Sequence, residues 1–239
     1  YNMLEKIGCR WFYPTQDAND PEVVPSLKVV AFNPLKEALA SPIKNRICNG
    51  DAWFFDVEYA KAKKQLDWAM KNRYNAIGWQ AGASNQKRSI LDQYLGLDSA
   101  GITKELRKRG MFLHGPAHSF DQFLLSDKYF ADHPEWFGMR NGKRSPQNFF
   151  GAQFCWSNAE ARKQFISNAT DFIVLAPEIH IFCTIPFDGG VPCECDVCKK
   201  AGSSNLLMLL CSELIEAVKK VRPDVQVETI GGYGAVQDP

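Results

Sequence analysis

The sequence of 239 residues lacks an excess of charge of either sign. Its 28 Lys and Arg side chains and 27 Asp and Glu side chains leave a formal net charge of +1. Proteins that bind nucleic acids or anionic membrane surfaces usually carry a clear basic excess. The composition therefore gives no electrostatic support for a nucleic-acid partner or for binding to a membrane surface.

Two further features are missing. No run of 18 apolar residues occurs, so we expect no membrane span in this chain. No signal peptide is visible, and the first residue is Tyr rather than Met. Because the chain opens within a helix-like pattern and closes just after a strand-like one, we expect further sequence on both sides.

From about Ala40 onward, strand-like and helix-like patterns alternate. The expected strands lie within residues 45–53, 75–80, 111–114, 179–185 and 225–230, and amphipathic stretches of helical period separate them. This alternation favours a parallel α/β fold, either a doubly wound sheet or a (β/α) barrel. No G-x-G-x-x-G motif follows the first strand, which argues against a dinucleotide-binding sheet.

The segments that follow the expected strands are the polar ones: NGDAW, WQAGASN, HGPAHSF, PFDGG and GGYG. In a barrel they would converge on the face that carries the active site. We therefore predict a TIM-type (β/α) barrel over residues 40–239, incomplete because five of the usual eight units are visible. Residues 1–33 have a different pattern and are expected to belong to a preceding domain and its linker.

Asp188 is the candidate catalytic residue. It directly follows an apolar strand, and Gly189 and Gly190 let the chain turn away and leave the carboxylate exposed. A carboxylate at a barrel strand end suits the work of a general acid, a general base or a nucleophile. The alternative is an ordinary Asp-Gly turn.

Glycoside hydrolysis normally requires two carboxylates, and the sequence does not place the second one. Glu194 lies close to Asp188 in the chain, whereas Glu228 lies within a strand and faces either into the barrel or outward. Asp51 ends the first strand and is an alternative. A further possibility is a carboxylate in sequence beyond this chain.

Other polar and aromatic residues at strand ends are candidates for substrate binding: Asn49, Asp51, Trp53, Trp79, His118 and Tyr233. Aromatic rings can stack on a sugar or donate to its hydroxyl groups, and an imidazole can shuttle a proton. The alternative for each aromatic is packing at the end of the core. We expect His114, which lies within a strand, to be structural, and prefer His118 in the following loop.

Cys193, Cys195 and Cys198 form the densest motif of the sequence. Three thiolates within six residues suit a tetrahedral Zn²⁺ whose fourth ligand is His133, Asp196 or a distant cysteine. Disulfides are the competing interpretation for an exported protein. We favour a structural clip, by zinc or disulfide, over a catalytic metal, and expect that catalysis requires no cofactor.

Several segments resemble known families. LEKIGCRWFYP, followed by VP, resembles the end of the small α/β N-terminal domain of α-glucuronidases and β-hexosaminidase-type hydrolases. HPEWFGMRNGKR, QFCWSNAEAR and IPFDGGVPCECDVCKKAG resemble a bacterial family of unknown function that joins this domain to a glycosidase-like (β/α)8 barrel. The most specific part is D-G-x-x-x-C-x-C-x-x-C, which begins at Asp188.

The resemblance implies an exported bacterial protein, periplasmic or extracellular, whose partner is an oligosaccharide or polysaccharide, including chains with uronic acids or amino sugars. It supplies no reaction. Three hypotheses therefore remain: a glycoside hydrolase, a glycan-binding barrel without catalysis, and a metal-dependent hydrolase. The third is disfavoured because catalytic zinc usually has His ligands and an open position.

Overall fold

The main sheet has five parallel strands in the order β3-β4-β5-β8-β9. This is seen in a computed structural model that describes residues 5, 8–11, 22–23, 25–26, 43–48, 59–80, 89–147, 152–187 and 189–229. The strands are β3 (Ile47–Cys48), β4 (Ala76–Gly78), β5 (Phe112–Gly115), β8 (Ile179–Cys183) and β9 (Gln226–Glu228). Their spatial order follows the chain order, as in a (β/α) barrel, whereas the order of a doubly wound sheet reverses.

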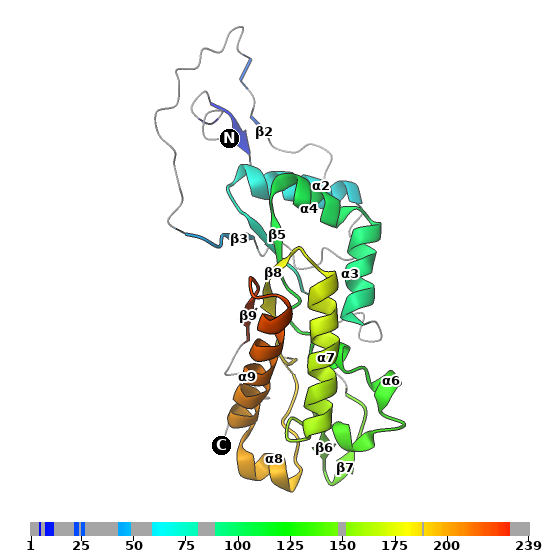
Figure 1. Cartoon of the computed structure of the whole chain (residues 1–239). Coiled ribbons are helices and arrows are strands. Elements are labelled where there is room, and N and C mark those ends of the chain that lie inside the picture. The colour runs from blue at the N-terminus through cyan, green and yellow to red at the C-terminus, as the bar shows by residue number, and fades with distance from the viewer. Residues whose placement is uncertain are drawn as a thin grey trace.

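Helices alternate with these strands along the chain. They are α2 (Tyr59–Lys71), α3 (Ile90–Ser99), α4 (Ile102–Arg109), α7 (Ala159–Leu175), α8 (Asp196–Ala201) and α9 (Ser203–Val221). Figure 1 shows α7 and α9 side by side next to β8 and β9, with α2 and α4 packed together over β5. In the part of the chain that the structure describes, no helix is long and apolar enough to cross a membrane.

Short elements occupy the region between β5 and α7. They are α5 (Phe120–Phe123), α6 (Ser126–Tyr129), the 3₁₀ helix η2 (Pro134–Trp136) and the antiparallel strands β6 (Met139–Arg140) and β7 (Lys143–Arg144). The β6–β7 turn uses Asn141 and Gly142 with φ of 50° and 74°, the left-handed backbone typical of a tight Asn-Gly hairpin. Figure 1 places β6, β7 and α8 at the same end of the molecule.

A separate two-stranded antiparallel sheet is formed by β1 (Arg10–Trp11) and β2 (Glu22–Val23). It is not hydrogen-bonded to the five-stranded sheet among the described residues. The assignment of residues 1–33 to the end of a preceding α/β domain stays a prediction.

The sequence Ser157-Asn-Ala-Glu160 matches a capping box, which predicts Ser157 as the N-cap of helix α7. Asn158, not Ser157, is the N-cap, and its side chain accepts from the backbone N–H of Ala161 at 3.0 Å. The Ser157 hydroxyl instead lies 3.3 Å from the sulfur of Cys155 and 3.2 Å from that of Cys198. The correction therefore has a physical cause, since the hydroxyl faces a group of thiols.

The core lies between the sheet and its helices. One apolar stripe of α7 recurs at helical spacing and is buried throughout; it comprises Ala161, Phe165, Ala169, Phe172 and Ile173. Phe182 of β8 packs against it, with its ring centroid 5.7 Å from that of Phe123 and 6.2 Å from that of Phe172. Each fully buried aromatic ring of this size stabilises the fold by roughly 2–3 kcal/mol.

Successive side chains of a strand point to opposite faces, so alternate residues leave the helix-facing core. Phe112 of β5 lies on that second face. The register between β5 and β8 shifts between Leu113 and His114, so His180 of β8 departs from the alternation and stacks its ring on that of Phe112 at a centroid distance of 4.9 Å. In a closed (β/α) barrel this second face is the interior. His114 and Glu228 share it, because each directly follows a residue that packs with the core, Leu113 and Val227 respectively.

Candidate functional site

The loop that follows β5 is joined to the chain that extends β8. Ile185 donates its backbone N–H to Ala117 O at 2.9 Å, and Ser119 donates to Ile185 O at 3.2 Å. His118 and Ile185 thus form an isolated parallel bridge beyond the strands. These bonds bring two of the predicted polar strand ends, HGPAHSF and IPFDGG, into contact.

His118 lies directly against the dipeptide that precedes Asp188. Its Nδ1 is 2.9 Å from Pro186 O, and its ring stacks on Phe187 at a centroid distance of 6.3 Å. The imidazole is 8% exposed, so it is positioned by packing as well as by its hydrogen bond. The structure therefore places His118 next to the candidate catalytic segment.

An imidazole–carboxylate pair lies on the sheet face away from the helices. His114 Nε2 of β5 is 2.8 Å from Glu228 Oε2 of β9, and Cys183 of β8 brings its sulfur within 4.8 Å of both. The Glu228 side chain is half exposed, whereas that of His114 is 15% exposed. His114 was expected to be structural and Glu228 had no assigned direction, so this pair is a site that the sequence did not reveal.

Cys183 is a poor nucleophile in this setting. Burial, and then the negative charge of Glu228, raise the pKa of its thiol to about 12. The reactive form of cysteine is the thiolate, which is scarce near neutral pH under these conditions. The ionisable chemistry of this part of the sheet therefore rests on His114 and Glu228.

Asp121 is a buried acid in α5, in the loop after β5. It is 5% exposed, and its Oδ1 has no hydrogen-bond partner in the described part of the chain. Burial raises the pKa of this carboxyl to about 8, although the backbone N–H groups of Asp121 and Gln122 oppose the shift. A carboxyl perturbed in this way is common at functional sites.

Gln153 contributes a buried amide beside the turn that carries Asp188. The residue is 1% exposed, and neither atom of its amide is hydrogen-bonded within the described ranges. A Cβ added to Gly190 would lie 2.1 Å from Gln153 Nε2, so only glycine fits there without movement of the amide. The second glycine of the D-G-G turn thus has a packing role that adds to its role in the turn.

The predicted site residues have different outcomes. Asp188, Asn49, Asp51, Trp53 and Tyr233 lie outside the described residues, and their roles stay predictions.

Trp79, which was expected to line a sugar site, is corrected to a core residue. It is 2% exposed, and its ring lies 5.9 Å from that of Phe172 and 6.4 Å from that of Tyr94. Its side chain faces the helices because Trp79 follows Ile77 at the two-residue spacing of one strand face.

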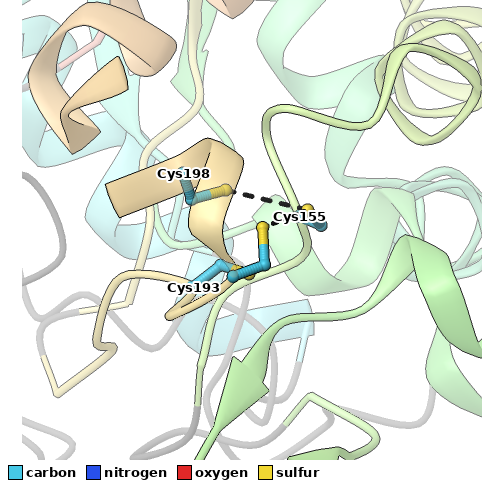
Figure 2. Close-up of side chains that lie close together, drawn as sticks. Cys155, Cys193 and Cys198 are labelled. Carbon is cyan, nitrogen blue, oxygen red and sulfur yellow. Dashed lines mark hydrogen bonds between the residues drawn. The ribbon is translucent and has the colours of Figure 1, made fainter. Parts of the chain in front are cut away.

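The cysteine motif gains a fourth member from the segment before α7. Cys155 joins Cys193, Cys195 and Cys198, and the four sulfur atoms all lie within 4.8 Å of one another. Figure 2 shows three of the four, Cys155, Cys193 and Cys198. His133 stacks on Trp136 and Asp196 is exposed, so neither of these predicted alternatives joins the group. The distant cysteine that the sequence left open is therefore Cys155.

Solved structures with a similar fold belong to carbohydrate-active enzymes. The GH36 α-galactosidase AgaA from Geobacillus stearothermophilus has a TM-score of 0.52 at 15% identity, over 78% of this chain and 28% of its own. The GH36 α-galactosidase AgaB from the same organism has a TM-score of 0.52 at 15% identity, over 77% of this chain and 27% of its own. The α-galactosidase from Lactobacillus brevis has a TM-score of 0.50 at 13% identity, over 78% of this chain and 26% of its own. The class defined by this likeness is a glycosidase-like α/β barrel fold.

The chain spans only about a quarter of the length of these structures. No curated protein matches the sequence. A family described as "Domain of unknown function (DUF4838)" matches residues 19–239. The chain belongs to this family.

Proposed function

We propose that this chain is part of a glycoside hydrolase that acts on a glycan at the carboxyl ends of the strands, with Asp188 as one catalytic carboxylate. The observation that carries the proposal is the meeting of two loops, in which His118 packs on Pro186 and Phe187 immediately before Asp188. The fold likeness to α-galactosidases supports the same class of reaction. Active sites of such barrels lie at this end of the sheet.

Glu228 is the second carboxylate in this proposal. It lies on the face that forms a barrel interior, is half exposed to solvent, and has His114 as its hydrogen-bond partner at 2.8 Å. One carboxyl group would protonate the glycosidic oxygen, and the other would attack the sugar or activate water. This chemistry needs no cofactor.

The substrate class follows from two sources. The sequence resemblance favours uronic acids or amino sugars, and the fold likeness favours galactosides. The sequence resemblance to exported glycan degraders also supports a periplasmic or extracellular location.

The proposal is tested by release of nitrophenol from nitrophenyl glycosides of galactose, glucuronic acid and N-acetylhexosamines, in both anomers. We expect turnover of at least one glycoside, and a loss of at least 100-fold in Asp188→Asn, which keeps the shape but removes the charge. Asp132→Asn, in an exposed loop, is the matched control and should remain active. Full activity of Asp188→Asn would overturn the assignment.

A glycan-binding barrel without catalysis is the other outcome of this test. Binding of oligosaccharides in calorimetry, with no turnover of any glycoside or oligosaccharide on the panel, would replace hydrolysis by binding as the function of the same site.

A further inference from the structure

The four clustered cysteines come from two segments that are far apart in the chain. Cys155 lies in the segment before α7, Cys193 and Cys195 lie in the loop after β8, and Cys198 lies in α8. All four are buried, with exposed fractions of 2–9%. Figure 2 shows the sulfur atoms of Cys155 and Cys198 pointing toward one another, with Cys193 below them.

The spacing of the sulfur atoms fits a single tetrahedral ion. Cys155 Sγ lies 3.8 Å from Cys195 Sγ and 3.7 Å from Cys198 Sγ. Zinc–sulfur bonds of about 2.3 Å in a tetrahedron separate neighbouring sulfurs by about 3.8 Å. A disulfide would require about 2.05 Å and would join the sulfurs in pairs, whereas here Cys155 is equally near to two others. An iron–sulfur cluster would hold its thiolates farther apart, because several atoms lie between them.

Donor groups surround the sulfurs, as expected around metal-bound thiolates. The backbone N–H of Met139 points at Cys193 Sγ at 3.2 Å. The Ser157 hydroxyl lies 3.3 Å from Cys155 Sγ and 3.2 Å from Cys198 Sγ. The Arg144 guanidinium interacts with Cys155. A zinc ion with four thiolates carries a net charge of −2, and these groups would stabilise it.

The cluster joins segments that are distant in the chain. Cys155 donates its N–H to Trp136 O at 2.8 Å, and Glu194 donates to Met139 O at 2.8 Å. Gln153 donates to Val191 O at 3.0 Å. The segments at 136–144, 152–157 and 189–198 are thus joined by short ladders and by this group of thiols, while Phe137, Phe154 and Trp156 anchor two of them in the core. Binding of a metal ion by such a group of ligands adds to the stability of the fold.

We propose that Cys155, Cys193, Cys195 and Cys198 bind one structural Zn²⁺ that holds the loop following Asp188 onto the segment before α7. Four protein ligands close the coordination sphere and leave no position for a reactive water. The ion therefore acts on the position of the loop and takes no part in the reaction. This inference is independent of the proposed hydrolase activity, because metal content is measured without any substrate.

The first experiment measures metal by mass spectrometry in the whole chain, purified with reductant and without metal-chelating resin. We expect about one zinc per chain. Cys155→Ala should lose most of this zinc, whereas Cys211→Ala, which removes a buried thiol of α9 outside the cluster, should retain it. Zinc retained in Cys155→Ala, or iron in place of zinc, would overturn the assignment.

A second measurement protects the test against variants that fail to fold. In the unaltered chain, about four thiols should become newly reactive toward a thiol reagent when a strong chelator is added. Cobalt substituted for zinc should give the intense visible bands of a tetrahedral thiolate site. A disulfide between Cys155 and any cysteine of the motif, found by mass spectrometry without reduction, would refute the proposal.

Discussion

The two ends of the sheet differ in how their polar groups are satisfied. At the amino ends of the strands, buried charges are paired within the fold. At the carboxyl ends, the Asp121 Oδ1 and the Gln153 amide are buried without a hydrogen-bond partner among the described residues. Unpaired buried polar groups cost free energy and are found where a ligand or a reaction requires them. In (β/α) barrels the carboxyl ends of the strands carry the active site and the amino ends contribute stability, and the difference agrees with the site that we propose.

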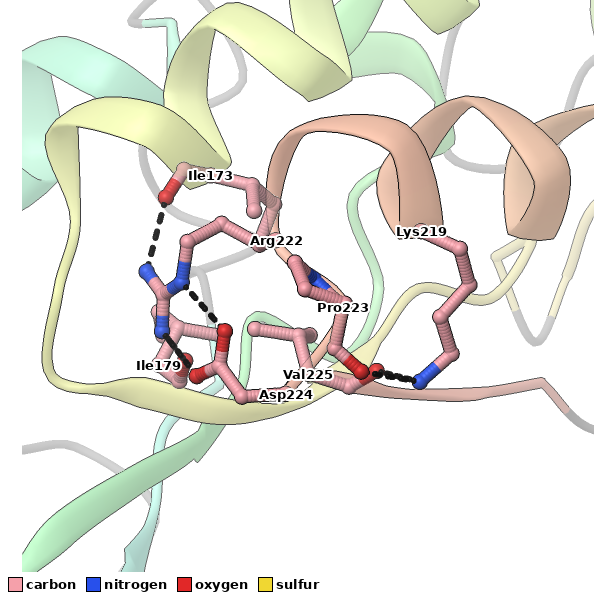
Figure 3. A network of polar contacts seen from close by, with 7 residues as sticks. All are labelled: Ile173, Ile179, Lys219, Arg222, Pro223, Asp224 and Val225. Atoms are coloured by element: carbon pink, nitrogen blue, oxygen red, sulfur yellow. Dashed lines mark hydrogen bonds and ion pairs between the residues drawn. The ribbon is translucent and has the colours of Figure 1, made fainter.

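The turn between α9 and β9 shows how the amino end is built (Figure 3). Arg222 donates to the backbone oxygens of Ile173 and Ile179 at 3.2 Å each, and to Asp224 at 2.9 Å. Lys219 donates to Pro223 O at 2.9 Å and to Val225 O at 2.7 Å. The end of α7, the start of β8 and the turn into β9 are thereby joined by two charged side chains, and both are hydrogen-bonded within the fold.

Glu178, just before β8, is a second example from the amino end. It is 4% exposed, accepts from the Tyr94 hydroxyl, and forms an ion pair with Arg107. Burial, followed by the contact with Glu178, raises the pKa of Tyr94. The phenol therefore stays protonated and remains a donor to the carboxylate.

The largest expected effect comes from a carboxylate of the carboxyl end. Glu228→Gln should lower kcat on a responsive nitrophenyl glycoside by about 100-fold or more, because general acid or base work is lost. Its stability in urea should change little, since the side chain is half exposed. Glu216→Gln, on the exposed side of α9, is the matched control. A large loss of stability without a change in kcat would show that Glu228 stabilises the fold, as the charges at the amino end do, and that the two ends do not differ in this way.

The second prediction concerns Asp121. Its pKa of about 8 in the fold exceeds the value of 3.8 in the unfolded chain, so its contribution to stability is fully present below pH 3.8 and is lost as the pH rises toward 8. By pH 7 the unfolded chain has released this proton while the fold largely retains it, and the resulting loss of stability is on the order of 4 kcal/mol.

Asp121→Asn should therefore flatten the dependence of unfolding free energy on pH between 4 and 8. The slope is the measured quantity, obtained from urea denaturation at several pH values, because the buried amide also changes stability by a constant amount. Asp132→Asn should keep the wild-type slope. An unchanged slope in Asp121→Asn would show that this carboxyl is not held neutral.

The third prediction is the counterpart at the amino end. Glu178→Gln should destabilise the fold by about 2–3 kcal/mol, since it removes the charge from a buried hydrogen-bonded pair. Arg107, whose side chain is 54% exposed, can turn to water and limits the loss. Zinc content and kcat per folded molecule should remain at wild-type values. If kcat falls under conditions where the variant is fully folded, then Glu178 contributes to activity, and the amino end is not limited to stabilising the fold.

Much of the fold could be predicted from local patterns. The buried stripe of α7 follows from apolar residues at helical spacing, and Gly110, the C-cap of α4 with a φ of 62°, follows from the preference of glycine for this position. Both depend only on neighbours in the chain. The expected strand at residues 111–114 corresponds to β5, shifted by one residue. Strand boundaries shift by a residue or two because they depend on the pairing partner, which the local pattern does not contain.

The site was less predictable because it depends on contacts distant in the chain. Cys155 lies about 40 residues from the cysteine motif, and in the sequence it resembles any single buried cysteine. The pairing of His114 with Glu228 spans 114 residues. Strand alternation alone could have put Glu228 and Gln226 on one face, but only the sheet shows which face is away from the helices. The same missing information led Trp79 to be assigned to the site rather than to the core.

The smallest expected effect belongs to Asp224, at the exposed edge of the amino-end network. The hydrogen bond from Arg222 lowers its pKa to about 2, so the pair stabilises the fold above pH 3.8 and the contribution is lost as the pH falls toward 2. Because the carboxylate is 57% exposed, solvent screens the pair and Asp224→Asn should cost less than about 1 kcal/mol at pH 7. The difference from wild type, measured by urea denaturation, should shrink below pH 4 and with added salt. Arg222 keeps its two backbone partners in this variant. A loss of stability as large as that of Glu178→Gln would therefore show that even the exposed charge of Asp224 is needed for the stability of the amino end.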